Sequence, residues 1–123
     1  MKILLLVFYL FILIGCEKNY CDPKVIQQNY FSGQEILISA PMAIKDIEKK
    51  ETVEIVKDGK HQSVPFGALK KDWEKMLEAY NRRTDCFVHF RTGERSWKSL
   101  SGREGYLHIR KNEVVDAILT RIS

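Results

Sequence analysis

Hydrophobic residues follow three patterns along this 123-residue chain, and each pattern predicts a different kind of segment. Residues 3–14 are apolar without interruption. Several short stretches farther along alternate apolar with polar residues, as half-buried β-strands do. Residues 68–83 repeat their apolar positions every three or four residues, which is typical of an amphipathic helix. The chain therefore predicts an apolar N-terminal segment followed by a mixed α and β region.

The segment 68–83 gives the strongest helix signal. Five apolar residues fall on one helical face, at spacings of 4, 7, 8 and 11 from the first: Leu69, Trp73, Met76, Leu77 and Tyr80. The opposite face mixes lysine with aspartate and glutamate, whereas a helix that lies on a membrane surface usually carries a mainly basic polar face. The pattern therefore favours a helix packed on a sheet over a membrane-surface or partner-binding helix.

Strands and turns are indicated on both sides of this helix. Asp58-Gly59 supplies the positive φ angles of a tight type I′ turn, so residues 52–57 and 60–66 predict a hairpin with Val53 opposite Val64. Residues 35–40 and 85–91 predict two more strands, the second of them central in the sheet. Ser39 is expected to cap a short helix over residues 41–50.

A second hairpin is predicted around Lys111-Asn112, between residues 106–110 and 113–121. A two-residue loop would place polar Asp116 opposite apolar Leu107, which indicates a β-bulge or a longer loop.

The order of elements predicts an α+β domain over residues 35–123, with a small antiparallel sheet and one main amphipathic helix packed on one face. Residues 16–34 are polar and contain the turn signals Asp22-Pro23 and Ser32-Gly33, so they predict an irregular spacer.

The apolar run at the N-terminus is too short to cross a bilayer comfortably. Its twelve residues span about 18 Å as a helix, against about 30 Å of bilayer hydrocarbon. Lys2 precedes the run and the small residue Gly15 follows it, which is the layout of a secretory signal peptide. Residues 1–15 are therefore predicted to be a signal peptide.

Leu13-Ile14-Gly15-Cys16 resembles the lipobox of bacterial lipoproteins. The resemblance implies a diacylglycerol on the Cys16 sulfur, cleavage before Cys16 and acylation of the new amino terminus. Two or three acyl chains make a stable membrane anchor, whereas one holds only marginally. The alternatives are an uncleaved signal anchor, or an ordinary signal peptide followed by a chance cysteine. Glu17, in place of aspartate, resembles the default sorting to the periplasmic face of the outer membrane.

With Cys16 lipidated, Cys21 and Cys86 remain as an even pair in an oxidising compartment, which favours a disulfide. This bond would tie the N-terminal segment to the middle of the domain. The alternatives are a buried free thiol at Cys86 and an intermolecular bond through Cys21.

Charge is distributed unevenly along the mature chain. Residues 16–81 carry ten lysines against eleven acids, whereas residues 82–123 carry nine basic residues against five acids and contain all seven arginines. Arginine suits planar carboxylate and phosphate groups. Nucleic acid is not expected as a partner in the periplasm, so the partner classes are an envelope protein, an acidic polymer or anionic headgroups. The alternative is a solvated basic rim. The candidate binding residues here include Arg91, Arg95 and Trp97.

The string from Ser101 to Tyr106 resembles the SGRxxY loop of periplasmic inhibitors of invertebrate-type lysozymes, with Ser101, Gly102, Arg103 and Tyr106 matching. The resemblance implies a loop that enters the acidic cleft of a lysozyme, and it adds Ser101, Arg103 and Tyr106 to the candidate binding residues. That family is a β-sandwich, from which the helix predicted over residues 68–83 departs. The alternative is a turn before a strand that begins at Tyr106, inside a long loop between strands.

No pattern in the sequence indicates an enzyme, a metal site or a cofactor. His61, His89 and His108 fall on three predicted strands without metal-ligand spacing, and no catalytic motif is present. The leading interpretation is a lipid-anchored envelope protein with a non-catalytic binding or assembly role, and the alternative is a lysozyme inhibitor.

Overall fold

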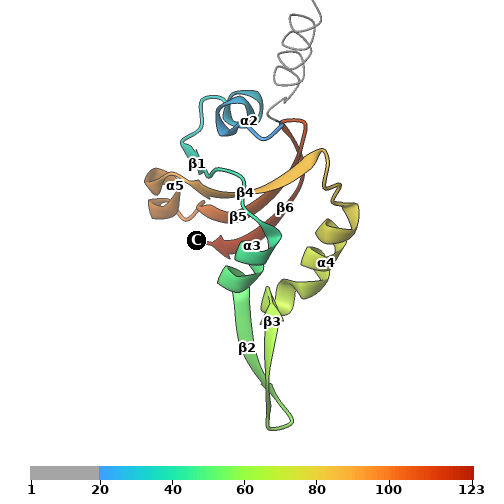
Figure 1. Cartoon of the computed structure of the whole chain (residues 1–123). Helices are drawn as coiled ribbons and strands as arrows, with labels where there is room; N and C mark the ends of the chain where they lie inside the picture. The colour runs from blue at the N-terminus through green and yellow to red at the C-terminus, as the bar shows by residue number, and fades with distance from the viewer. Residues whose placement is uncertain (1–19) are drawn as a thin grey trace, which may run out of the picture.

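The structure is a computed structural model that describes residues 20–123. A four-stranded antiparallel sheet has the order β1-β4-β5-β6, and β2 and β3 form a separate two-stranded sheet (Figure 1). The elements in chain order are α2 (Pro23–Tyr30), β1 (Ile36–Ile38), α3 (Ile44–Glu51), β2 (Thr52–Lys57), β3 (Lys60–Pro65), the 3-10 turn η1 (Gly67–Leu69), α4 (Lys70–Ala79), β4 (Asp85–Thr92), α5 (Glu94–Lys98), β5 (Arg103–Arg110) and β6 (Glu113–Ile122). The predicted α+β class is confirmed.

The main sheet has a hydrophobic core on each face because side chains alternate along its strands. One face carries Cys86, Val88 and Phe90 of β4, which form a core cluster with Ile26 of α2. The other face carries Phe87, which joins a cluster with Trp73 and Met76 of α4, the helix predicted from the apolar stripe. The sheet therefore lies between α2 on one side and α3, α4 and the β2–β3 hairpin on the other (Figure 1).

Both predicted hairpins are confirmed. In the first, Asp58 and Gly59 have φ angles of 53° and 75°, and Val53 faces Val64. This hairpin projects from the body of the domain (Figure 1), and every residue of β2 is exposed. In the second, His108 faces Asp116 while Ile109 faces Val114, so the extra residue is an expected β-bulge. Because of this bulge, Asp116 lies opposite the polar residue His108 and not opposite Leu107.

The prediction of an irregular spacer over residues 16–34 is wrong for residues 23–30, which form α2. The Asp22 side chain accepts a hydrogen bond from the Lys24 N–H at 3.0 Å, and Pro23 occupies the first turn of the helix. Asp-Pro is thus a helix start here and not a turn. Ile26 is fully buried, so α2 contributes to the core.

The predicted cap at Ser39 is also wrong. Helix α3 begins at Ile44, and Ala43 before it provides no side-chain cap. The Ser39 hydroxyl instead accepts a hydrogen bond from the His89 N–H at 2.8 Å, beside the β1–β4 pairing. Ser39 therefore extends the connection between β1 and β4.

The predicted bond between Cys21 and Cys86 is present, with 6.4 Å between the two Cα atoms. The chain is also held at this point by backbone hydrogen bonds, because the Asn112 N–H donates to the Tyr20 carbonyl at 2.7 Å. The start of the described chain is therefore fixed to β4 and to the β5–β6 turn. Cys16 and the predicted signal peptide lie outside the described residues. No helix within residues 20–123 is long and apolar enough to cross a membrane.

Candidate functional site

The segment 92–105, predicted as a long loop, contains α5 and the start of β5. Thr92 organises it: the Trp97 indole N–H donates to the Thr92 carbonyl at 3.0 Å, and the Arg103 N–H donates to the Thr92 hydroxyl at 2.9 Å. The Ser96 hydroxyl lies 2.7 Å from the same Thr92 oxygen. These three hydrogen bonds to Thr92 explain why a segment rich in glycine, serine and charged residues is structured.

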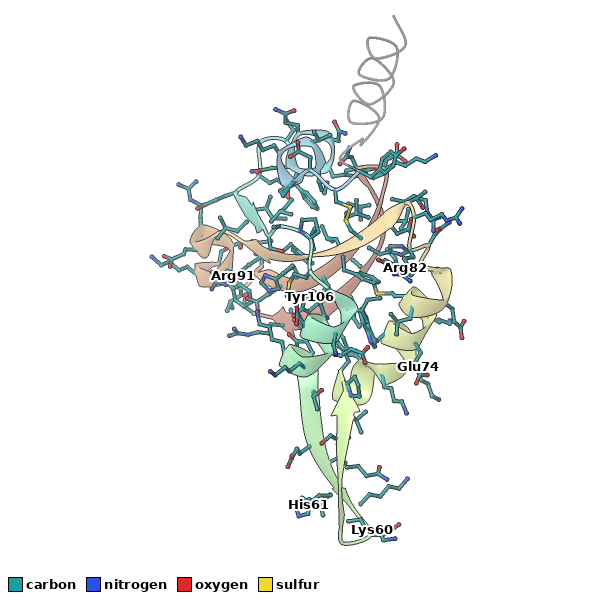
Figure 2. All side chains as sticks on the ribbon, in the orientation of Figure 1. Lys60, His61, Glu74, Arg82, Arg91 and Tyr106 are labelled. Carbon is teal, nitrogen blue, oxygen red and sulfur yellow. A yellow bond between two sulfur atoms is a disulfide. The ribbon has the colours of Figure 1, made fainter. Side chains whose placement is uncertain are left out.

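Two guanidinium groups lie over the Trp97 ring. The central guanidinium carbons of Arg91 and Arg121 lie 4.9 and 5.6 Å from the Trp97 ring centroid, which is cation–π geometry. Gly102 packs against the same indole so closely that any side chain there would collide with it. We call Arg91, Trp97 and Arg121 the arginine–tryptophan stack; Figure 2 labels Arg91 at this end of the sheet.

Glu104 connects the stack to the sheet. Its carboxylate lies 3.2 Å from Arg91, 3.8 Å from Arg121 and 3.7 Å from His89. Burial and the nearby Lys50 ammonium lower the pKa of His89, although Glu104 acts in the opposite direction, so His89 is mainly neutral at pH 7. Two guanidinium groups thus share one carboxylate, and the stack keeps an excess positive charge.

A groove of about 490 Å³ lies beside α5, and we call it the α5 groove. It is lined by Gly33, Gln34, Glu35, Thr92, Gly93, Arg95, Ser96, Ser99 and Ser101. The Glu35 carboxyl group lies against Gly93, where any side chain would collide with it. The Ser99 and Ser101 hydroxyls lie 3.0 Å apart. The groove thus combines a carboxylate, a guanidinium and several hydroxyls.

The two charged side chains of the groove have no ion-pair partner among residues 20–123. The ion pairs of this region involve Glu104 with Arg91 and Arg121, and neither Glu35 nor Arg95 takes part in them. Both residues are exposed. A carboxylate and a guanidinium that open onto one concave surface can each bind a ligand group of opposite charge.

The structure places the six predicted binding residues in four different settings, the last of which is the buried position of Tyr106. Arg95 and Ser101 line the α5 groove, and Arg91 and Trp97 belong to the arginine–tryptophan stack. The Arg103 guanidinium donates to the neighbouring Gly102 carbonyl at 2.8 Å.

Tyr106 lies in the core and not on the surface. Its side chain is fully buried, and its hydroxyl donates to the Glu51 carboxylate at 2.8 Å. Figure 2 labels Tyr106 at the centre of the domain. Burial and Glu51 together raise the pKa of Tyr106. Because residues 103–105 are already paired with β4 and β6, the string that resembles the inhibitor loop begins a central strand. Tyr106 therefore has a structural role.

The three histidines do not form a common site. His61 is exposed on the separate β2–β3 sheet, where Figure 2 labels it, and His108 is buried under α4. His108 Nε2 lies 2.7 Å from Asp85, whose carboxylate also accepts two hydrogen bonds from Arg110. Within residues 20–123, no group of three or more histidine, cysteine or acidic side chains is placed to hold a metal ion.

Comparison with known protein families, with curated proteins and with solved structures finds no match to this chain. The candidate site therefore rests on the chain's own geometry. Sequence reasoning missed Glu35, which is separated from Arg95 by 60 residues and reaches the groove only through the β1–β4 pairing.

Proposed function

We propose that this chain is a bacterial lipoprotein whose domain binds an envelope ligand without catalysis, at the α5 groove and the adjacent arginine–tryptophan stack. The observation that carries the proposal is the pair of unpaired opposite charges, Glu35 and Arg95, in one groove lined with serine hydroxyls. The ligand carries carboxylates for the arginines, and ammonium or hydroxyl donors for Glu35. An acidic sugar–peptide polymer of the cell wall combines these groups on one chain.

The tether is consistent with this role. Cys16 precedes Tyr20 by four residues, which span at most about 14 Å when fully extended. Because Tyr20 is hydrogen-bonded to the β5–β6 turn and Cys21 is bonded to Cys86, a lipid on Cys16 would hold the domain close to the membrane. The α5 groove would then be presented within the envelope layer next to that membrane.

The positions of the histidines favour a binding role over catalysis, because none of them lies where it could activate a groove hydroxyl. The carboxylate–imidazole pair formed by Asp85 and His108 has side chains exposed by 0% and 1%, so a substrate cannot touch it. The Ser96 hydroxyl of the groove bonds to Thr92 and to the Gly93 carbonyl, and no histidine bonds to it among the described residues. The groove therefore offers hydrogen bonds and charge but no activated nucleophile.

Cosedimentation with purified cell-wall polymer tests the proposed function. We expect Arg95→Ala to weaken binding about tenfold or more, because a charge-assisted hydrogen bond contributes about 1.5–3 kcal/mol. Glu35→Gln should weaken it in the same direction. Arg82→Ala is the matched control, since Arg82 is an exposed arginine outside both the groove and the stack (Figure 2). Equal binding by the Arg95 and Arg82 variants would contradict the proposal.

A further inference from the structure

Strand β6 is an edge strand of the main sheet. It has ten residues, it pairs with β5 on one side, and no other strand described in residues 20–123 pairs with its outer side. An edge that pairs with no other strand presents backbone N–H and C=O groups to any strand that can lie beside it. The two register shifts of its pairing with β5 fall near its ends, which leaves Asp116–Leu119 as a regular centre.

The sequence of β6 is complementary to itself in the antiparallel direction. When two copies are aligned around Ala117, Glu113 of each copy lies opposite Arg121 of the other. In the same register Val115, the extra residue of the β-bulge, falls opposite Leu119, and these two side chains are 45% and 39% exposed. Opposite charges and apolar side chains placed directly across from each other stabilise an antiparallel pair.

From this self-complementarity we propose that β6 pairs with β6 of a second copy around Ala117, so that two four-stranded sheets join into one of eight strands. The contact is isologous, with a two-fold axis perpendicular to the sheet. The Arg121 side chain is 66% exposed although it lies over Trp97 and 3.8 Å from Glu104, so the pairing would draw it from the arginine–tryptophan stack.

The direction of the two-fold axis agrees with a common membrane anchor. Rotation about an axis perpendicular to the sheet keeps each face of the sheet on its own side. Helix α2 lies on one side of the sheet and the β2–β3 hairpin on the other (Figure 1). Both copies therefore present α2 and Tyr20 on the same side. With the proposed lipid on Cys16, both anchors reach one membrane; the pairing itself does not depend on the lipid.

Disulfide trapping of the full-length protein in its own membranes tests the pairing. Directly opposite residues of an antiparallel pair have Cα atoms about 4.5–5.5 Å apart, which is within disulfide range. Ala117 is exposed, so Ala117→Cys should give a covalent dimer on oxidation, at least about tenfold above the yield of Lys60→Cys at the hairpin tip. Equal yields from the two variants would overturn the proposal.

The register is tested by two further variants. Two copies of position 115 would lie about 13 Å apart along the strands, so Val115→Cys alone should not crosslink, whereas Val115→Cys coexpressed with Leu119→Cys should. In the Ala117→Cys background, Arg121→Glu should reduce the dimer and Glu113→Arg added to it should restore the dimer. Strong crosslinking of Val115→Cys alone would contradict this register. Intact masses that retain the Cys21–Cys86 bond verify that each variant folds.

Discussion

Asp85 shows how one buried charge is satisfied in this small domain. Its side chain is fully buried at the start of β4, and burial alone would raise its pKa. Hydrogen bonds from Arg110, the Asn81 N–H, Thr84 and His108 outweigh burial and hold the pKa of Asp85 well below its ordinary value. Asp85 thereby joins the end of α4 to β4 and β5. The sequence predicted this residue only as the first of a strand.

We expect Asp85→Asn to lower the free energy of unfolding by about 3 kcal/mol at pH 7, because the variant loses the charge that its partners surround. The folded pKa lies below the unfolded value of about 3.9. The stabilisation is therefore complete above about pH 5 and is lost as the pH falls below about 4. Urea denaturation at pH 7 and at pH 3 should show a smaller difference between wild type and variant at pH 3. A difference independent of pH would contradict this assignment.

At the scale of elements, the sequence predicted the turns and helices that are determined by residues close together in the chain. Asp58-Gly59 specified a turn with two positive φ angles, and the register of β2 and β3 followed from it. The apolar stripe correctly predicted helix α4. The helix is shorter than the predicted 68–83 and ends at Ala79; just beyond it, the Asn81 N–H donates to the Asp85 carboxylate.

Short elements and long-range contacts were not predictable in the same way. Helix α5 has five residues, too few for an apolar period to be recognised, and hydrogen bonds to Thr92 hold it in place. The α5 groove combines Glu35 with Arg95 only because β1 pairs with β4. A property that depends on pairing between distant segments leaves no local pattern in the sequence. This explains why the sequence did not predict Glu35 as part of the groove.

The bond between Cys21 and Cys86 joins the chain just before α2 to β4. It closes a loop of 65 residues, and the chain-entropy relation gives about 4 kcal/mol for a loop of this length. The variant Cys21→Ser with Cys86→Ser should therefore lose about 4 kcal/mol of unfolding free energy in chemical denaturation. Reductant should destabilise the wild type and leave the double variant unchanged. A wild-type denaturation midpoint that does not respond to reductant would contradict this prediction.

At the scale of the whole molecule, the start of the described chain and the hairpin tip lie at opposite ends (Figure 1). A lipid on Cys16 would place α2 nearest the membrane and direct the β2–β3 hairpin away from it. The arginine–tryptophan stack and the α5 groove lie at one end of the main sheet, between these two poles. The proposed pairing of β6 would preserve this orientation in both copies.

The proposed lipid anchor on Cys16 makes the most direct prediction about the whole molecule. Wild-type protein extracted from membranes should have the mass of a chain that begins at Cys16 and carries acyl groups, with two hydrogens gained on reduction of the Cys21–Cys86 bond. Cys16→Ser should carry no acyl group, because the sulfur that accepts the diacylglycerol is absent. Since both proteins keep Cys21 and Cys86, the gain on reduction should be the same and serves as the folding control. A wild-type mass that includes residues 1–15 without lipid would mean that the apolar run itself is the anchor. The domain would then lie farther from the membrane than four residues allow.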